Sequence, residues 1–225
     1  MDERIEKIKE IVREKLSSSA HDLEHTFRVF KLARMLAKEE ADVNMEVVEL
    51  ASLLHDIARV REDSDKTGET NHAKLGAVWA EKILTELGYP DEIVKNVKYC
   101  IETHRYRGDS IPKTKEAKIL FDADKLDAIG AVGIARAYMI AGERGERIYL
   151  NKDINEYIKN NLVNGKINGR IKDVSKHTPN IEFETKFKYI PERLFTEKAK
   201  EMAKERIAFM ELFFERLRKE MLGEQ

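Results

Sequence analysis

The sequence predicts an all-α protein, and two observations support this prediction. Its 225 residues include only 4 Pro and 11 Gly, the two residue types that interrupt helices most strongly. Up to about residue 140, apolar residues recur at helical spacing, and the breaks between these stripes are short and polar. Cys100 is the single Cys, which excludes an intrachain disulfide, and the chain is long enough for a core without covalent cross-links.

The first part of the chain is predicted to form a series of packed helices. Ile5, Ile8 and Val12 share one face of the first helix, which ends at the serine run of residues 17–19. Glycines such as Gly108 and Gly142 mark later helix ends. The predicted helices cover about residues 2–16, Asp22–Glu40, Met45–Val60, Asn71–Leu87, Asp91–His104 and Thr114–Ile140.

The amino-acid composition changes after the sixth predicted helix. Residues 143–190 are rich in Gly, Asn and Lys and show weak periodicity, which indicates either a lid or a disordered insertion. Within them, the alternating IEFETKFKYI predicts a short strand or hairpin arm. A last amphipathic helix, about Glu192–Met221, is expected to pack back on the bundle or to form a contact between subunits of a homo-oligomer. The expected organisation is therefore a helical core over residues 1–142, an irregular insertion or lid over 143–190, and a C-terminal helix over 191–225.

Composition excludes several classes of function. The 41 Lys and Arg against 42 Asp and Glu give a formal charge of −1, which removes the main driving force for binding nucleic acid. No apolar run approaches the roughly eighteen residues of a membrane span, so no membrane partner is expected. The start of the chain is charged and amphipathic, unlike a secretory signal, and favours a cytoplasmic location.

Histidines fall on the apolar faces of four predicted helices, and an Asp does so on a fifth. A titratable side chain at a core-facing position needs a partner, and facing helices of a bundle are where side chains build metal sites. Imidazoles and carboxylates suit Mn, Fe, Co, Ni, Zn or Mg. The most specific local feature is the adjacent pair His55-Asp56. Adjacent side chains of a helix point in different directions, so these two can bind one ion only if it lies beside the helix, between their two directions. The candidates are His25, His55, Asp56, His72, His104 and Asp124.

The segments HDLEHTFRV, ELASLLHDIAR, THRYRG and FDADKLDAIGAVGIARA resemble the HD-domain superfamily of metal-dependent phosphohydrolases. The resemblance covers about residues 17 to 140 and is greatest for small stand-alone bacterial and archaeal members, including nucleotide pyrophosphohydrolases. It implies an HD-domain helical bundle and a metal set of His25, His55, Asp56 and Asp124. His21 and Asp122 remain alternatives for the first and last ligands.

The resemblance leaves two readings for His72 and His104. They complete a second ion's ligands, as in superfamily members with two metals, or they bind substrate phosphate or serve as proton donors around a single ion. Cations near the ligand segments suit a phosphate pocket, since guanidinium groups bind two oxygens at once. We expect Arg105 and Lys125 to act in catalysis beside Asp56, and the remaining cations to bind substrate: Arg28, Arg59 and Arg107.

The implied function is a divalent-metal-dependent phosphohydrolase acting on a phosphoester or phosphoanhydride, with a nucleotide as the substrate that the resemblance favours. One or two ions, among Mn, Ni, Co, Mg, Fe and Zn, are the expected cofactor. Two alternatives come from other classes. HD-fold di-iron oxygenases share a pattern that His72 and His104 complete, and a non-catalytic nucleotide-binding module is the third reading.

Overall fold

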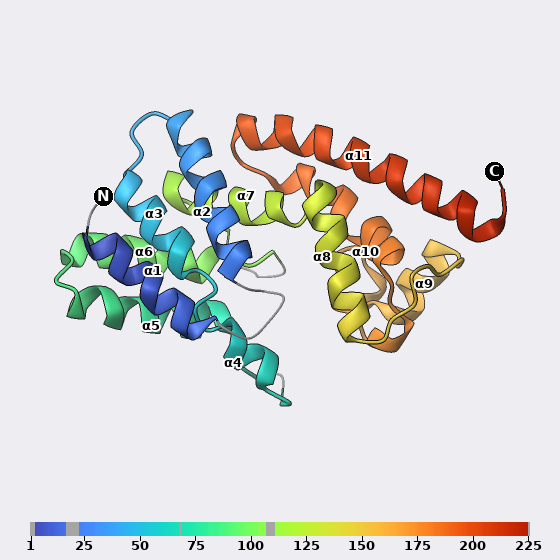
Figure 1. The fold of residues 1–225 in the computed structure, drawn as a ribbon, viewed down its shortest axis with the longest axis horizontal. Coiled ribbons are helices and arrows are strands. Elements are labelled where there is room, and N and C mark those ends of the chain that lie inside the picture. Colours follow the sequence, from blue (N-terminus) through green and yellow to red (C-terminus); the bar gives the residue numbers. More distant parts are fainter. Residues whose placement is uncertain (1–2, 17–22, 68, 107–110, 225) are drawn as a thin grey trace. The chain divides into compact units, whose positions relative to one another are not determined.

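The computed structural model describes residues 3–16, 23–67, 69–106 and 111–224. Its regular elements are helices, and the described residues form no sheet beyond one isolated bridge between Leu162 and Ile171. The all-α prediction is confirmed. The chain separates into two compact units, Met1–Asp124 and Lys125–Gln225 (Figure 1). None of the described helices combines the length and the apolar character that crossing a membrane requires.

The first unit is organised around its third helix. This helix contacts the first, second and sixth helices, and its residues from Val47 to Leu54 are buried almost without exception. A helix that is apolar all round belongs in a core, which explains its central position (Figure 1). The elements of the unit are α1 Glu3–Lys15, α2 Leu23–Lys38, α3 Met45–Leu54, α4 Arg59–Ser64, α5 His72–Glu86, α6 Asp91–Thr103 and most of α7 Lys115–Asp127.

The single helix predicted over Met45–Val60 is wrong, because the backbone tightens after Leu54. The Ile57 amide donates to the Leu54 carbonyl at 3.2 Å and the Arg59 amide to the Asp56 carbonyl at 2.8 Å. These three-residue hydrogen bonds interrupt the α-helix before α4 resumes it. The pair His55-Asp56 therefore lies on a tight turn at the end of the buried helix α3.

Helix ends also place His72 and His104. The Asn71 side chain caps α5 by accepting from the amides of Ala73 at 3.1 Å and Lys74 at 3.2 Å, which makes His72 the first residue of that helix. At the same end of this helical pair, α6 stops at Thr103, and His104 is its C-terminal cap. Because α5 and α6 pack against each other, both histidines are carried by one helical hairpin.

The long helix predicted over Thr114–Ile140 is also wrong, since it consists of α7 and a separate α8, Gly130–Glu143. Gly130 adopts φ +80°, a left-handed conformation that a helix interior does not contain and that Gly adopts at little cost. The amides of Ala128 and Ile129 close three-residue turns on Lys125 and Leu126, each at 3.2 Å. Asp124 thus lies one turn before the end of α7.

The second unit contains the segment for which the sequence predicted weak structure. That segment is folded, because Tyr157, Leu162 and Ile181 form a small apolar core that Leu150 and Ile154 extend. Its elements are α9 Ile154–Asn161, α10 Pro179–Thr185 and three-residue 3₁₀ turns at Val163–Gly165, Val174–Lys176 and Phe187–Tyr189.

The strand predicted from IEFETKFKYI is wrong. Ile181, Phe183 and Phe187 are buried in alternation, as the pattern implied, but α10 and the following 3₁₀ turn achieve this burial. Pro179, at the first helical position, presets the backbone angle for α10. The last helix, α11 Glu197–Leu222, packs against α8 within this unit, and its Phe214 ring stacks on Phe183 at 4.8 Å between centroids. It begins later than predicted because Pro191–Arg193 form another 3₁₀ turn.

Candidate metal centre

The carboxylate of Asp56 lies between two pairs of histidines in the first unit. Its Oδ2 is 3.7 Å from Nε2 of His25 and 3.6 Å from Nε2 of His55. Its Oδ1 is 3.3 Å from Nε2 of His72 and 3.5 Å from Nε2 of His104. Each carboxylate oxygen therefore faces its own pair of imidazoles.

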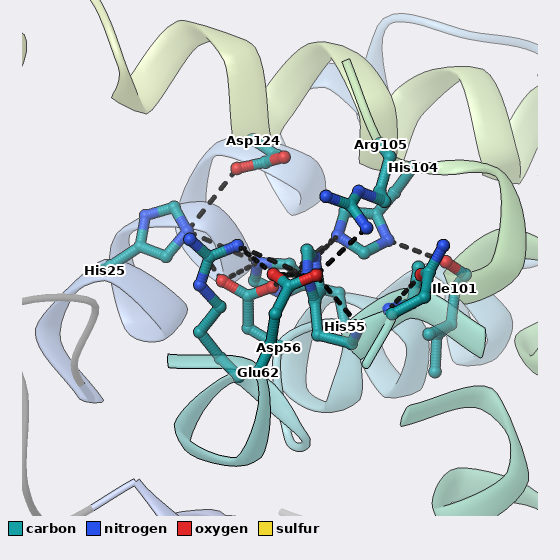
Figure 2. A network of polar contacts seen from close by, with 12 residues as sticks. His25, His55, Asp56, Glu62, Ile101, His104, Arg105 and Asp124 are labelled. Atoms are coloured by element: carbon teal, nitrogen blue, oxygen red, sulfur yellow. Dashed lines mark hydrogen bonds and ion pairs between the residues drawn. The ribbon is translucent and has the colours of Figure 1, made fainter. Parts of the chain in front are cut away.

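Within each pair the two imidazoles converge. The Nε2 atoms of His25 and His55 are 3.3 Å apart, and those of His72 and His104 are also 3.3 Å apart. Two groups of ligand atoms compatible with a metal ion result, and they share Asp56. Asp124 adds a further carboxylate, with Oδ1 at 3.4 Å from Nε2 of His25 (Figure 2). We call His25, His55, Asp56, His72, His104 and Asp124 the Asp56 cluster.

Hydrogen bonds on the far side of three rings assign their tautomers. Nδ1 of His55 donates to the Ser52 carbonyl at 2.8 Å, and Nδ1 of His104 donates to the Ile101 carbonyl at 2.6 Å. Nδ1 of His72 donates to Oε2 of Glu62 at 2.6 Å. With the proton on Nδ1, each Nε2 presents a lone pair.

This tautomer assignment tests whether the residues fit a cation. Nε2 of His72, Nε2 of His104 and Oδ1 of Asp56 all present lone pairs to one another in a buried space. Without a positive charge between them such atoms repel, whereas a divalent ion satisfies all of them. Imidazoles held by carbonyl or carboxylate partners on their other nitrogen are also the usual arrangement of metal-bound histidines.

Burial and neighbouring charge set the protonation state that metal ligands need. Burial lowers the pKa of His55 to about 4 and also lowers the pKa of His72, so both rings are neutral. Burial by itself raises the pKa of Asp56, but the adjacent imidazoles outweigh it and hold that pKa well below its usual range. The cluster thus combines an ionised carboxylate with neutral imidazoles.

Glu62 is a member of the site that sequence reasoning missed. Besides accepting from His72, its carboxylate lies 3.0 Å from Nη1 of Arg59 and 3.0 Å from Nη1 of Arg105 (Figure 2). Burial opposes ionisation of Glu62, yet the hydrogen bond from His72 and the two guanidinium charges lower its pKa to about 2. The available signal was its position three residues after Arg59, the spacing at which side chains of a helix meet.

The arginines predicted to act in catalysis or substrate binding differ in where they lie. Arg59 and Arg105 reach the edge of the Asp56 cluster through Glu62, and Arg59 also lies 3.2 Å from Nδ1 of His72. Arg28 is one turn beyond His25 and pairs with Glu24 on its own helix at 3.6 Å. Arg107 is outside the described residues.

The other residues predicted from the sequence lie in different places. Asp124 lies beside His25, and the alternative Asp122 is fully buried on the same helix. Lys125 is buried and begins the second unit. His21, the alternative to His25, is outside the described residues, whereas His25 itself lies in the cluster.

Comparison with known proteins places the chain in a family. The HD domain matches residues 22–129. The Bacillus subtilis protein YpgQ is 31% identical over 209 residues, which cover 92% of this chain and 87% of that protein. The crystal structure of YpgQ in complex with ADP has a TM-score of 0.72 at 28% identity, covering 98% of this chain and 100% of that one.

Two further proteins are similar to this chain. A predicted HD superfamily hydrolase from an uncultured Thermotogales bacterium has a TM-score of 0.63 at 30% identity, covering 96% of this chain and 92% of that one. The 3'-5' exoribonuclease YhaM of Listeria welshimeri is 26% identical over 138 residues, which cover 56% of this chain and 44% of that protein. With His55-Asp56 at the centre of the cluster, these similarities show that the chain belongs to the HD-domain superfamily.

Proposed function

We propose that this protein is a divalent-metal-dependent phosphohydrolase that cleaves a phosphoester or phosphoanhydride, with a nucleotide as substrate. The observation that carries the proposal is the Asp56 carboxylate, whose two oxygens each face a separate pair of imidazole lone pairs. That arrangement supports two ions held side by side, of which Asp56 is the shared ligand.

The proposed ligands divide into two sets. His25, His55, Asp56 and Asp124 would hold one ion, and Asp56, His72 and His104 would hold the other. Divalent ions bound there supply a Lewis acid for a phosphoryl oxygen and lower the pKa of bound water. His72 and His104 are thus assigned as metal ligands rather than as direct substrate contacts.

The remaining residues of the site act by position and charge. Glu62 fixes the proton of His72 on Nδ1 and keeps Nε2 available as a ligand. It also holds Arg59 and Arg105, which bring positive charge to the edge of the cluster. The Arg105 side chain is 33% exposed, so its remaining N–H groups are accessible to phosphoryl oxygens. We assign Arg105 and Arg59 to phosphate binding on this basis.

The choice of a nucleotide rests on similarity. YpgQ of Bacillus subtilis, which matches the chain along nearly its whole length, was solved in complex with ADP. The balanced charge of the chain, 41 Lys and Arg against 42 Asp and Glu, disfavours a long polyanionic substrate. We therefore place free nucleotides ahead of nucleic acid.

A substrate panel tests the proposal. Nucleoside mono-, di- and triphosphates, a short single-stranded RNA and generic phosphoesters are incubated with the protein and added Mn, Co, Ni or Mg. Phosphate, pyrophosphate and nucleoside monophosphate are then quantified. We expect metal-stimulated release from at least one nucleotide and loss of that release with a chelator. Faster cleavage of the RNA than of every nucleotide would reject the nucleotide assignment, and no metal-stimulated release would reject the hydrolase.

A di-iron oxygenase is the second candidate, because the two ligand groups sharing Asp56 also match what a pair of irons requires. The two functions differ in their need for electrons and oxygen. Protein purified without oxygen is loaded with iron and examined by electron paramagnetic resonance. A mixed-valence signal together with oxygen consumption would favour the oxygenase, whereas phosphate release under anaerobic conditions supports the hydrolase.

A further inference from the structure

A cavity of about 460 Å³ lies within the second unit, built from residues that the Asp56 cluster does not include. Its wall contains three basic side chains, Arg147, Lys152 and Lys176, together with His177 and Thr178. No Asp or Glu from the described part of the chain lines it. The volume is within the range of pockets that hold small molecules.

The wall that carries Arg147 and Lys152 is fixed to its neighbours. Asn180 on α10 accepts from the Leu150 amide at 3.0 Å and donates to the Leu150 carbonyl at 3.0 Å. The Tyr138 hydroxyl on α8 donates to the Ile148 carbonyl at 3.2 Å. The connection between α8 and α9 contains no helix, and these hydrogen bonds hold it in place at Ile148 and Leu150.

The part of the wall that carries Lys176 and His177 is held by a second set of hydrogen bonds. The Asn161 side chain donates to the Asp173 carbonyl at 2.9 Å and accepts from the Asp173 amide at 3.1 Å. This pairing holds the segment that delivers Lys176 and His177. A site whose walls are positioned in advance loses little conformational entropy when a ligand binds.

The two ammonium groups of the cavity are only weakly compensated. Lys176 pairs with Asp173 at 2.7 Å and Lys152 with Glu156 at 3.5 Å, and these are exposed contacts of the kind that contribute little. Arg147 has no acidic partner among the described residues. A guanidinium and two ammonium groups around one cavity attract an anion.

A neighbouring cavity in the same unit provides a contrast. It measures about 400 Å³ and is lined by Glu184, Glu211 and Glu215 as well as by basic residues. There, Lys188 pairs with Glu184 at 2.6 Å and Arg218 with Glu215 at 3.1 Å. The charges of that cavity compensate one another, so it has no surplus to offer an anion.

We propose that the cavity lined by Arg147, Lys152, Lys176 and His177 binds a phosphorylated small molecule. Guanidinium and ammonium groups donate to phosphate oxygens with charge-assisted hydrogen bonds, and Arg147 supplies the planar fork that phosphate matches best. The site is separate from the Asp56 cluster in its residues, and the proposal does not depend on the proposed hydrolase function.

The test is calorimetric titration of the full chain with the Asp56 cluster disabled. Protein carrying Asp56→Ala, and in parallel the unaltered chain treated with chelator, is titrated with pyrophosphate, ADP and succinate. We expect pyrophosphate or ADP to bind both preparations, and Arg147→Ala to weaken that binding by about tenfold, the effect of losing one charge-assisted contact. Lys188→Ala removes an equal charge from the compensated cavity and is expected to change the affinity less than about twofold.

Three results would overturn the proposal. They are the absence of any binding heat for pyrophosphate and ADP, equal weakening by Arg147→Ala and Lys188→Ala, and succinate binding as tightly as the phosphates. Because turnover is not measured, a failed hydrolase assay would leave this result intact, and a failed titration would leave the hydrolase proposal intact.

Discussion

Each unit of the chain buries histidine in a polar network, and the two networks are built in opposite ways. In the second unit, His177 accepts at Nδ1 from the Tyr157 hydroxyl at 2.8 Å and donates from Nε2 to Glu182 at 2.9 Å. Asn161 in turn donates to the Tyr157 oxygen at 2.8 Å. Each donor of this His177 network has an acceptor, so the network is complete with protein atoms alone.

The Asp56 cluster is built differently. His55, His72 and His104 each use Nδ1 on a carbonyl or carboxylate, and their Nε2 lone pairs then converge on an ionised carboxylate. Both networks are buried and both contain carboxylates, so neither burial nor residue type separates them. A structural histidine differs from a candidate ligand in its second ring nitrogen. In a candidate ligand, the lone pair of that nitrogen points toward other ligand atoms.

The largest effect is expected from removing the carboxylate that the two ligand groups share. Asp56→Ala should prevent binding of both ions and lower metal-dependent activity by more than about a hundredfold, since changes outside the ligand shell already cost 10- to 100-fold. Metal content measured by mass spectrometry and the initial rate of phosphate release check this. Glu69→Gln, which alters an exposed carboxylate of the same unit, is the matched control. Full metal content in the Asp56 variant would remove the distinction between the two networks.

A smaller effect is expected from Glu62→Gln, which keeps the shape of the side chain but removes its charge. The amide no longer requires the His72 proton to be on Nδ1, and it no longer compensates Arg59 and Arg105. We expect metal affinity to fall by about 10- to 100-fold, with loss of one ion before the other. Titration with Mn followed by equilibrium dialysis measures this. Unchanged affinity for both ions would show that Glu62 does not position a ligand.

The His177 network should respond in stability and not in metal content. Tyr157→Phe keeps the ring in the core but leaves Nδ1 of His177 without its hydroxyl donor. A buried polar atom deprived of its partner costs about 1 to 3 kcal/mol, which lowers Tm by several degrees in a chain of this size. Thermal unfolding followed by circular dichroism gives the shift. A drop in bound metal in this variant would contradict the separation of the two networks.

The positions of the cluster histidines were predictable because each continues an apolar stripe of its own helix. Val29 and Leu36 indicated the inward face on which His25 lies, and Val97 and Ile101 did the same for His104. Periodicity reports which face of a helix is buried. It therefore predicted that the imidazoles point into the core, without information about contacts between helices.

Other features were beyond the reach of periodicity. The apolar pattern continues from Leu54 into Ile57 and Ala58, so the tight turn under His55-Asp56 leaves no signal in residue type. Glu62 looks like one acid among 42 acidic residues, because its role depends on partners from other segments of the chain, such as His72 and Arg105. The buried alternation around Phe183 was read correctly as burial and wrongly as a strand, since a short helix followed by a 3₁₀ turn produces the same alternation.

We propose that Asp56 joins two groups of metal ligands. Counting the ions bound by two proteins distinguishes this arrangement from a site for a single ion. The unaltered chain and His104→Gln are saturated with Mn, freed of excess ion by dialysis, and analysed for Mn per chain. His104 contributes to only one group, so we predict about two ions in the unaltered chain and about one in the variant, which retains His25, His55, Asp56 and Asp124. One ion in both proteins would contradict the claim, because it would mean that His72 and His104 hold no metal.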